Sequence, residues 1–133
     1  MRIRKSTFRY IEQEIYDYHK SKRHFDEITK NIIFATTEKH EIRGTEISDP
    51  TFSSVSMLVS DKVRSRIAIN LNAIDAAFGG LDNTKRVILE DKYWERPYLT
   101  WTTIAEIHFQ DRRTVYNWRT EMVLGIAMTL GLN

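Results

Sequence analysis

The sequence predicts an all-α fold, with long N-terminal helices followed by a C-terminal three-helix unit that contains a helix-turn-helix. Apolar side chains recur at intervals of three and four residues from Ser6 to about Phe34 and again from Phe52 to Phe78, which is the period of one helix face. The run from Thr100 to Arg119 has the pattern of two helices joined by a very short turn. A length of 133 residues with 41% hydrophobic content supports one modest core.

The first predicted helix covers Ser6 to about Phe34. Ser6 or Thr7 can cap its start, and no glycine or proline interrupts the run, so we expect one long amphipathic helix. Lys22 and Thr29 stand where a strict heptad has apolar residues, which argues against a continuous coiled coil. The apolar stripe predicts either docking on the chain's own later helices or a homodimer contact through this N-terminal helix. Its members are Phe8, Ile11, Ile15, Tyr18, Phe25, Ile28, Ile32 and Ile33.

A connecting loop is expected next, at about residues 35–53. The apolar period fails there, and Gly44 and Asp49-Pro50 accumulate with threonine, serine and glutamate, as is typical of a loop. After it, a second long helix is predicted to run from Phe52 to Phe78, with Gly79-Gly80 as its end.

A third helix is predicted to begin at Asp82 and to end before Arg96-Pro97, because the residue before a proline disfavours the α region. This helix would support the C-terminal hairpin. We therefore divide the chain into a helical N-terminal and oligomerisation region of residues 1–80 and a helix-turn-helix DNA-binding domain of residues 81–133.

The C-terminal hairpin divides at Asp111, whose carboxylate can cap the start of a helix. Thr100 can cap the shorter helix before it, which leaves His108, Phe109 and Gln110 for the turn. In the second helix of the hairpin Val115, Trp118 and Met122 are predicted to pack inward.

The other face of that helix carries arginine, asparagine and tyrosine, a combination that suits insertion into the major groove of duplex DNA. Arginine can bind guanine or phosphate, asparagine can pair with adenine, and tyrosine can reach a phosphate or a thymine methyl group. An ordinary helical hairpin with solvated arginines is the alternative interpretation. The predicted DNA-binding residues are Arg112, Arg113, Tyr116, Asn117, Arg119 and Thr120.

Net charge alone does not predict DNA binding. From Asp82 to Asn133, seven lysines and arginines balance seven aspartates and glutamates. Affinity would depend on local placement of the arginines of the predicted face, with help from Lys85, Arg86 and Arg96 if the fold gathers them. A dimer that holds two half-sites, or a second contact with RNA polymerase, would raise the effective affinity.

Several segments together resemble one family of regulators. They are Phe8 to His19 (FRYIEQEIYDYH), Asp49-Pro50-Thr51, and Lys92 to Pro97 (KYWERP) leading into Leu99-Thr100-Trp101. Over nearly the whole chain, their order is similar to that of the RinA/ArpU-type transcriptional regulators of phages and prophages of Gram-positive bacteria. The C-terminal part of those regulators is similar to region 4 of sigma factors. The resemblance implies an activator of late phage genes that acts in the cytoplasm of a bacterial host cell, with double-stranded DNA and host RNA polymerase as partners.

The turn departs from the pattern of that family at two positions. A helix-turn-helix of this type usually has glycine in the turn and a small serine cap, whereas this chain has Phe109 and Asp111. Phe109 would strain a left-handed backbone. Either the turn avoids positive φ or the hairpin angle differs from the usual one. Gln110 also replaces the apolar residue often found before the cap.

Catalytic and metal-binding patterns are not evident. The four histidines are scattered along the chain, and no pair has metal-binding i, i+4 spacing with a carboxylate partner. His19 and His24 share the first predicted helix, but they are five residues apart and point away from one another. Glycine-rich phosphate loops are absent, and the chain has no cysteine. We therefore expect no enzymatic activity, no cofactor and no metal. The N-terminus does not resemble a secretory signal, and no segment could cross a bilayer, so we expect a soluble protein without a membrane partner.

Two other functional classes remain open at this point. A small terminase-like component of phage DNA packaging also combines a helix-turn-helix with oligomerising helices, but usually places the helix-turn-helix nearer the N-terminus. A helical adaptor that binds only protein would not bind duplex DNA at low salt.

Overall fold

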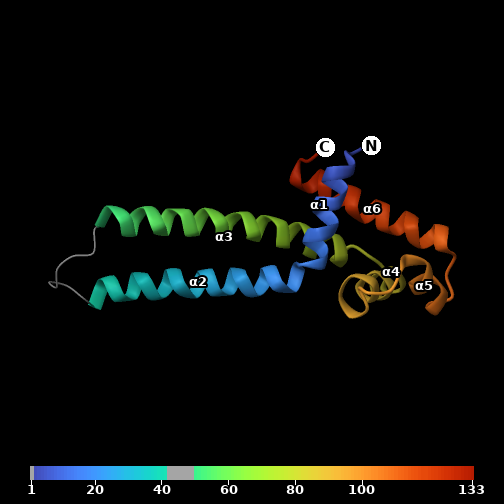
Figure 1. Cartoon of the computed structure of the whole chain (residues 1–133), viewed down its shortest axis with the longest axis horizontal. Helices are drawn as coiled ribbons and strands as arrows, with labels where there is room; N and C mark the ends of the chain where they lie inside the picture. Colours follow the sequence, from blue (N-terminus) through green and yellow to red (C-terminus); the bar gives the residue numbers. More distant parts are fainter. Residues whose placement is uncertain (1, 42–49) are drawn as a thin grey trace. The chain divides into compact units, whose positions relative to one another are not determined.

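The computed structural model describes the backbone of residues 2–41 and 50–133, and the side chains of residues 2–35 and 58–133. Within these ranges the chain is helical and contains no strand, which confirms the all-α prediction (Figure 1). The elements are α1 (Lys5–Tyr16), α2 (Tyr18–Glu41), α3 (Pro50–Gly79), α4 (Asn83–Glu90), the π-helical turn η1 (Asp91–Glu95), α5 (Trp101–Ile107) and α6 (Arg112–Leu130).

These helices form two compact units. Unit 1 combines Met1–Tyr18 with Asn72–Asn133, and unit 2 consists of His19–Leu71. The first helix of the chain therefore belongs to the same unit as the last, and the units do not follow the expected division near residue 80. Inside unit 1, α1 packs on α6 and η1, and the Thr7 hydroxyl donates to the carbonyl of Asn133 at 2.7 Å.

The expected single N-terminal helix is wrong, because Asp17 separates α1 from α2. Asp17 has non-helical backbone angles (φ −87°, ψ 5°), although neither glycine nor proline is present. The break follows from docking within unit 1. The Trp94 indole donates to the carbonyl of Ile15 at 2.8 Å, which satisfies one of the carbonyls left free at the end of α1. Ile11 and Ile15 are fully buried there. The apolar stripe of α1 thus docks on the chain's own later helices, which was one of the two alternatives.

The predicted loop is shorter than expected where the structure describes it. Helix α2 continues to Glu41 and α3 begins at Pro50, so residues 36–41 and 50–53 are helical. Proline is favoured at the first helical position, where its missing N–H group would have no partner in the helix. The remaining part of the predicted loop, residues 42–49, lies outside the described residues.

The second predicted helix is present as α3, and it ends at Gly79 as expected. The Arg86 side chain helps to cap this end. Its guanidinium donates to the carbonyls of Phe78, Gly79 and Leu81 at 3.2, 3.4 and 3.3 Å. These bonds satisfy carbonyls that a helix C-terminus leaves free.

The third predicted helix begins where expected but ends in a different geometry. The Asp82 side chain accepts from the backbone N–H of Lys85 at 2.9 Å and caps α4. From Asp91 the chain continues as the π-helical turn η1. Such turns shift side chains around the helix axis and are often found at functional positions. In this chain η1 directs the Asp91, Lys92 and Tyr93 side chains into unit 1, where all three are buried.

The core of unit 1 joins all of its helices. In this core the Trp94 indole stacks on the Phe78 ring, with 4.5 Å between the ring centroids. The Tyr18 hydroxyl donates to Asp75, and burial followed by this hydrogen bond raises the pKa of Tyr18 to about 12. The largest fully buried side chains of the described residues are Ile11, Ile15, Ile74, Leu89, Tyr93, Ile104, Val115, Val123 and Ile126.

Unit 2 is a hairpin of α2 and α3 that lie side by side (Figure 1). The Arg64 guanidinium lies 5.9 Å from the centroid of the Phe25 ring across the pair. Leu71 is the only buried side chain among those described in this unit. In the described part of the chain, no helix is long and apolar enough to span a bilayer.

Replacement of Ile15 by alanine tests the docking of α1. We expect Ile15→Ala to lower the free energy of unfolding by about 2–5 kcal/mol, because the fully buried side chain leaves a cavity. Tryptophan fluorescence during urea unfolding measures this, since Trp94, Trp101 and Trp118 all lie in unit 1. The matched control is Ile107→Ala, whose side chain is exposed, and we expect it to have a much smaller effect. Equal losses from the two variants would contradict the docking.

Candidate nucleic-acid interface

The turn between α5 and α6 closes as a compact hydrogen-bonded motif. The Thr100 hydroxyl accepts from the backbone N–H of Thr103 and caps α5, as predicted. At the other end of α5, the N–H groups of Phe109 and Gln110 donate to the carbonyls of Glu106 and Ala105 at 3.1 and 2.9 Å. This is the Schellman pattern, which requires a left-handed residue.

Phe109 provides that left-handed residue, with φ of 56°. Of the two alternatives for this turn, the one that avoids positive φ is wrong. The usual occupant is glycine, since a side chain strains this conformation. The Phe109 ring is 95% exposed, so it meets no neighbour that would add a clash to the strain.

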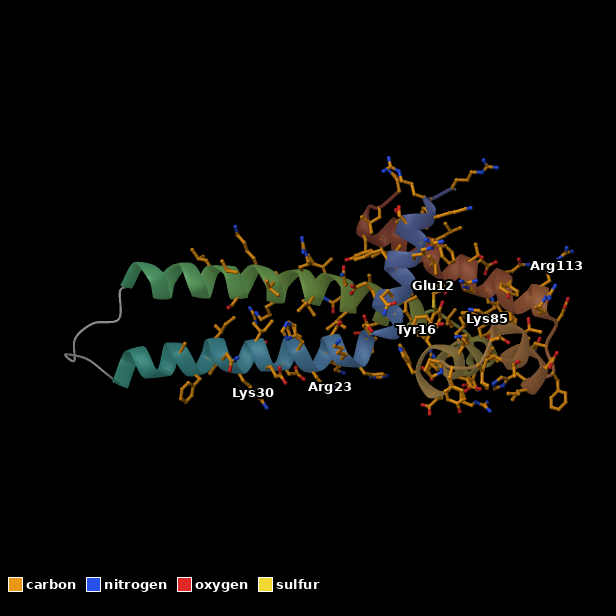
Figure 2. All side chains as sticks on the ribbon, viewed as in Figure 1. Glu12, Tyr16, Arg23, Lys30, Lys85 and Arg113 are labelled. Atoms are coloured by element: carbon orange, nitrogen blue, oxygen red, sulfur yellow. The ribbon has the colours of Figure 1, made fainter. Side chains whose placement is uncertain are left out.

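Helix α6 begins as predicted, with Asp111 as its cap. The Asp111 carboxylate accepts from the backbone N–H of Arg113 at 3.4 Å. Arg112 and Arg113 are exposed in the first turn of the helix, and Figure 2 shows the Arg113 side chain extending outward from α6. Together with Tyr116 they line an open hollow on the surface. Two cations and a phenol thus surround one concavity at a helix N-terminus, a position that favours anions.

Asn117 and Thr120 extend this surface along α6, and both are exposed. The Thr120 hydroxyl donates to the carbonyl of Tyr116 at 3.0 Å, so its oxygen is left as an acceptor. The Asn117 amide offers both a donor and an acceptor. We call the surface formed by Arg112, Arg113, Tyr116, Asn117 and Thr120 the α6 polar face.

The opposite face of α6 packs into unit 1. Val115 and Met122 are buried as predicted, while Trp118 is half-buried. The Lys85 ammonium lies 5.7 Å from the centroid of the Trp118 ring, within the range of a cation–π contact. Helix α6 is therefore fixed on one side by apolar packing and left free on the other.

Arg119 does not belong to the exposed side on which it was predicted. Its Nε and Nη2 atoms donate to the two carboxylate oxygens of Glu12 at 2.7 and 2.6 Å, and these hydrogen bonds raise the pKa of Arg119. The Glu12 and Arg119 side chains are only 13% and 24% exposed. Because its donors are held by α1, we leave Arg119 out of the α6 polar face.

The Glu12–Arg119 pair is enclosed by aromatic rings. The Arg119 guanidinium lies 5.1 Å from the centroids of both the Phe8 and Trp101 rings. The Tyr93 hydroxyl donates to the Glu12 carboxylate at 2.9 Å, and burial raises the pKa of Tyr93 well above its ordinary value. One carboxylate on α1 thus connects η1 with α6. Figure 2 labels Glu12 where α1 passes α6.

A signal for the position of Arg119 exists in the sequence. Arg119 follows the buried Val115 by four residues and precedes the buried Met122 and Ile126 by three and seven. This spacing places Arg119 on the inner face of the helix. The partner could not be found in this way, because Glu12 is 107 residues away in the sequence.

Lys92 is a second cation held inside unit 1. Its ammonium donates to the Tyr16 hydroxyl at 2.6 Å and to the carbonyl of Pro97 at 3.1 Å, and it faces the Trp101 ring. Burial lowers the pKa of Lys92. These contacts join the end of α1 and η1 to the segment that leads into α5.

Asp91 fixes the turn that precedes α6. Its carboxylate accepts two hydrogen bonds from Arg96, one of them at 2.7 Å. Its Oδ2 atom lies 2.6 Å from Nε2 of His108, the C-cap residue that follows α5. Hydrogen bonding by Arg96 is the main reason why the pKa of Asp91 is lowered. Asp91 and Glu12 are positioning residues that the sequence alone did not reveal.

The other cations expected to assist the interface have separate contacts. Arg86 caps α3, Arg96 pairs with Asp91, and Lys85 contacts Trp118. Within the described ranges, no group of three or more histidines and carboxylates could hold a metal ion. Comparisons with protein-family models, curated proteins and solved structures found no match to the chain.

The Glu12–Arg119 pair should contribute measurably to stability. We expect Glu12→Gln to lower the free energy of unfolding by about 1.5–3 kcal/mol, because the charged hydrogen bonds to a partly buried guanidinium are weakened. Urea unfolding followed by tryptophan fluorescence measures the change. Glu106→Gln makes the same substitution at an exposed position on α5 and should have little effect. A loss no greater than that of this control would contradict the assignment.

The lowered pKa of Asp91 predicts a stability difference that depends on pH. A folded-state pKa below the unfolded value of about 4 stabilises the fold above pH 4. That contribution is lost as the pH falls through the folded-state pKa. We therefore expect Asp91→Asn to be less stable than the natural chain at pH 7, and the difference to narrow below about pH 4. Unfolding curves across this pH range measure the difference in free energy of unfolding between the two proteins. A difference that does not change with pH would contradict the stabilising role of the Asp91 carboxylate.

Proposed function

We propose that this protein binds duplex DNA through the α6 polar face and acts as a transcriptional regulator of the phage or prophage type. One observation carries the proposal. Arg112, Arg113 and Tyr116 face outward around one hollow at the start of a helix, and that helix follows a shorter one after a tight turn. This arrangement is the one by which a recognition helix enters a major groove with its N-terminal residues toward the bases.

The side chains of the α6 polar face suit contacts with both the phosphates and the base edges of DNA. Arginine side chains at the helix start can bind phosphate or the O6 and N7 atoms of guanine, and the Asn117 amide matches adenine. The N-terminal end of the helix dipole adds to the attraction for phosphate. Arg119 contributes indirectly, because its pairing with Glu12 holds α6 in place.

The α6 polar face carries few charges, so a single copy should bind weakly. Each phosphate neutralised adds to a salt-dependent affinity, and Arg112 and Arg113 are its only cations. A second contact raises the effective affinity by holding α6 near its site. The resemblance to RinA/ArpU-type regulators supports host RNA polymerase as that second contact, and activation of late phage genes as the outcome.

Selection of bound fragments from random duplex DNA, followed by anisotropy titrations with the selected sequence, tests the proposal. We expect Arg113→Ala to weaken specific binding by about 1–3 kcal/mol and to relax selectivity at one base position. If Arg112 binds phosphate, Arg112→Ala should weaken binding to all sequences alike and make the salt dependence less steep.

Arg23→Ala is the matched control, because Arg23 is an exposed arginine on α2 of unit 2 (Figure 2). Its binding should equal that of the natural chain. Unchanged binding by both α6 variants would contradict the assigned surface. Absence of any retention on duplex DNA at low salt would contradict DNA binding itself and favour a helical adaptor.

A further inference from the structure

Helix α3 carries an apolar stripe that its own unit leaves uncovered. Val59 and Val63 are 56% and 41% exposed, and Ile67 is half-buried. With Lys62 and Arg66 these residues line a hollow along the helix. We call this surface the α3 stripe.

The α3 stripe follows the same spacing as a buried core. Val59, Val63 and Ile67 are succeeded at intervals of four, three and four residues by Leu71, Ile74 and Phe78, all of which are buried. Helix α3 therefore has a core-type face along its described length, but only the C-terminal end of that face is covered. Valines and isoleucines in such a continuous row are typical of a surface that packs against another helix.

The charges beside the α3 stripe indicate which kind of helix fits. Asp61 is paired with Arg64 at 3.1 Å, whereas Lys62 and Arg66 have no carboxylate partner among the described residues. Lys62 and Arg66 line the same hollow as Val59, Val63 and Ile67, so the edges of the α3 stripe are positive.

A second copy of this chain is a poor match for that surface. In a two-fold symmetric contact the same patch meets itself, so the Lys62 and Arg66 side chains of the two copies would approach one another. Like charges at an interface oppose association, whereas opposite charges favour it.

We propose that the α3 stripe binds an amphipathic helix of a partner protein, with apolar residues on one face and glutamates or aspartates along its edges. The partner's apolar face covers Val59, Val63 and Ile67, and its carboxylates pair with Lys62 and Arg66. This inference is independent of DNA binding by α6, since the two surfaces lie in different units.

Two synthetic helices test the proposal against the full-length protein. Both have leucines at the core positions of a heptad repeat, and one has glutamates and the other lysines at the flanking positions. By fluorescence anisotropy we expect the glutamate peptide to bind and the lysine peptide to bind at least about tenfold more weakly. Binding of the glutamate peptide should weaken as the salt concentration rises.

Variants of α3 locate the contact. Val63→Asp should weaken binding of the glutamate peptide by about tenfold or more. Ile69→Asp is the matched control, because Ile69 is 60% exposed on the same helix but does not line the hollow. The double variant Lys62→Glu, Arg66→Glu should reverse the preference and favour the lysine peptide. Circular dichroism checks that each variant retains its helical content.

Three results would overturn the proposal. Equal binding of both peptides, or no binding of the glutamate peptide, would contradict the proposed pairing of the partner's carboxylates with Lys62 and Arg66. Light scattering that shows a dimer which Val63→Asp converts to a monomer would assign the α3 stripe to a second copy of the chain. The α6 variants that lose DNA binding should still bind the glutamate peptide. Failure of one proposal can therefore be distinguished from failure of the other.

Discussion

The ion pair between Glu12 and Arg119 is the interaction on which the arrangement of unit 1 depends. It joins the first helix to the last, and the Tyr93 hydroxyl brings η1 to the same carboxylate. Removing either charge would leave the other partly buried without its partner, which is more costly than never burying the pair. The surrounding aromatic rings exclude water and strengthen the attraction. The pair thus sets the position of α6 and decides which of its faces is left to solvent.

Two further polar contacts extend this control to the turn before α6. Asp91 connects Arg96 with His108 at the end of α5, while Lys92 joins α1 to the segment that leads into α5. The left-handed Phe109 is held between these anchored elements. Strain at one residue persists when its surroundings fix the backbone on both sides. The α6 polar face is consequently presented from a well-supported turn.

The two units differ in how they use their apolar surface. In unit 1, the faces of α1 and α6 are buried against neighbouring helices, and Ile11, Ile15 and Val115 are inaccessible to solvent. In unit 2, two helices alone can cover only part of each other, and Val59 and Val63 stay exposed beside two cations. A pair of helices is smaller than the bundles that normally enclose a core. Unit 1 therefore buries the apolar faces of its own helices and holds α6 in place. Unit 2 leaves the α3 stripe uncovered.

The sequence by itself determined the helical class and the starts of α4, α5 and α6. Caps at Asp82, Thr100 and Asp111 could be predicted, because a cap needs only a side chain and N–H groups two or three residues away. The exposure of Arg112 and Arg113 followed from the helical period in the same way. Tertiary structure alone decided the break at Asp17, where the indole that binds the Ile15 carbonyl comes from 79 residues later. It also decided which residue pairs with Arg119: the helical spacing places Arg119 on the inner face of α6, but no local pattern specifies a partner 107 residues distant.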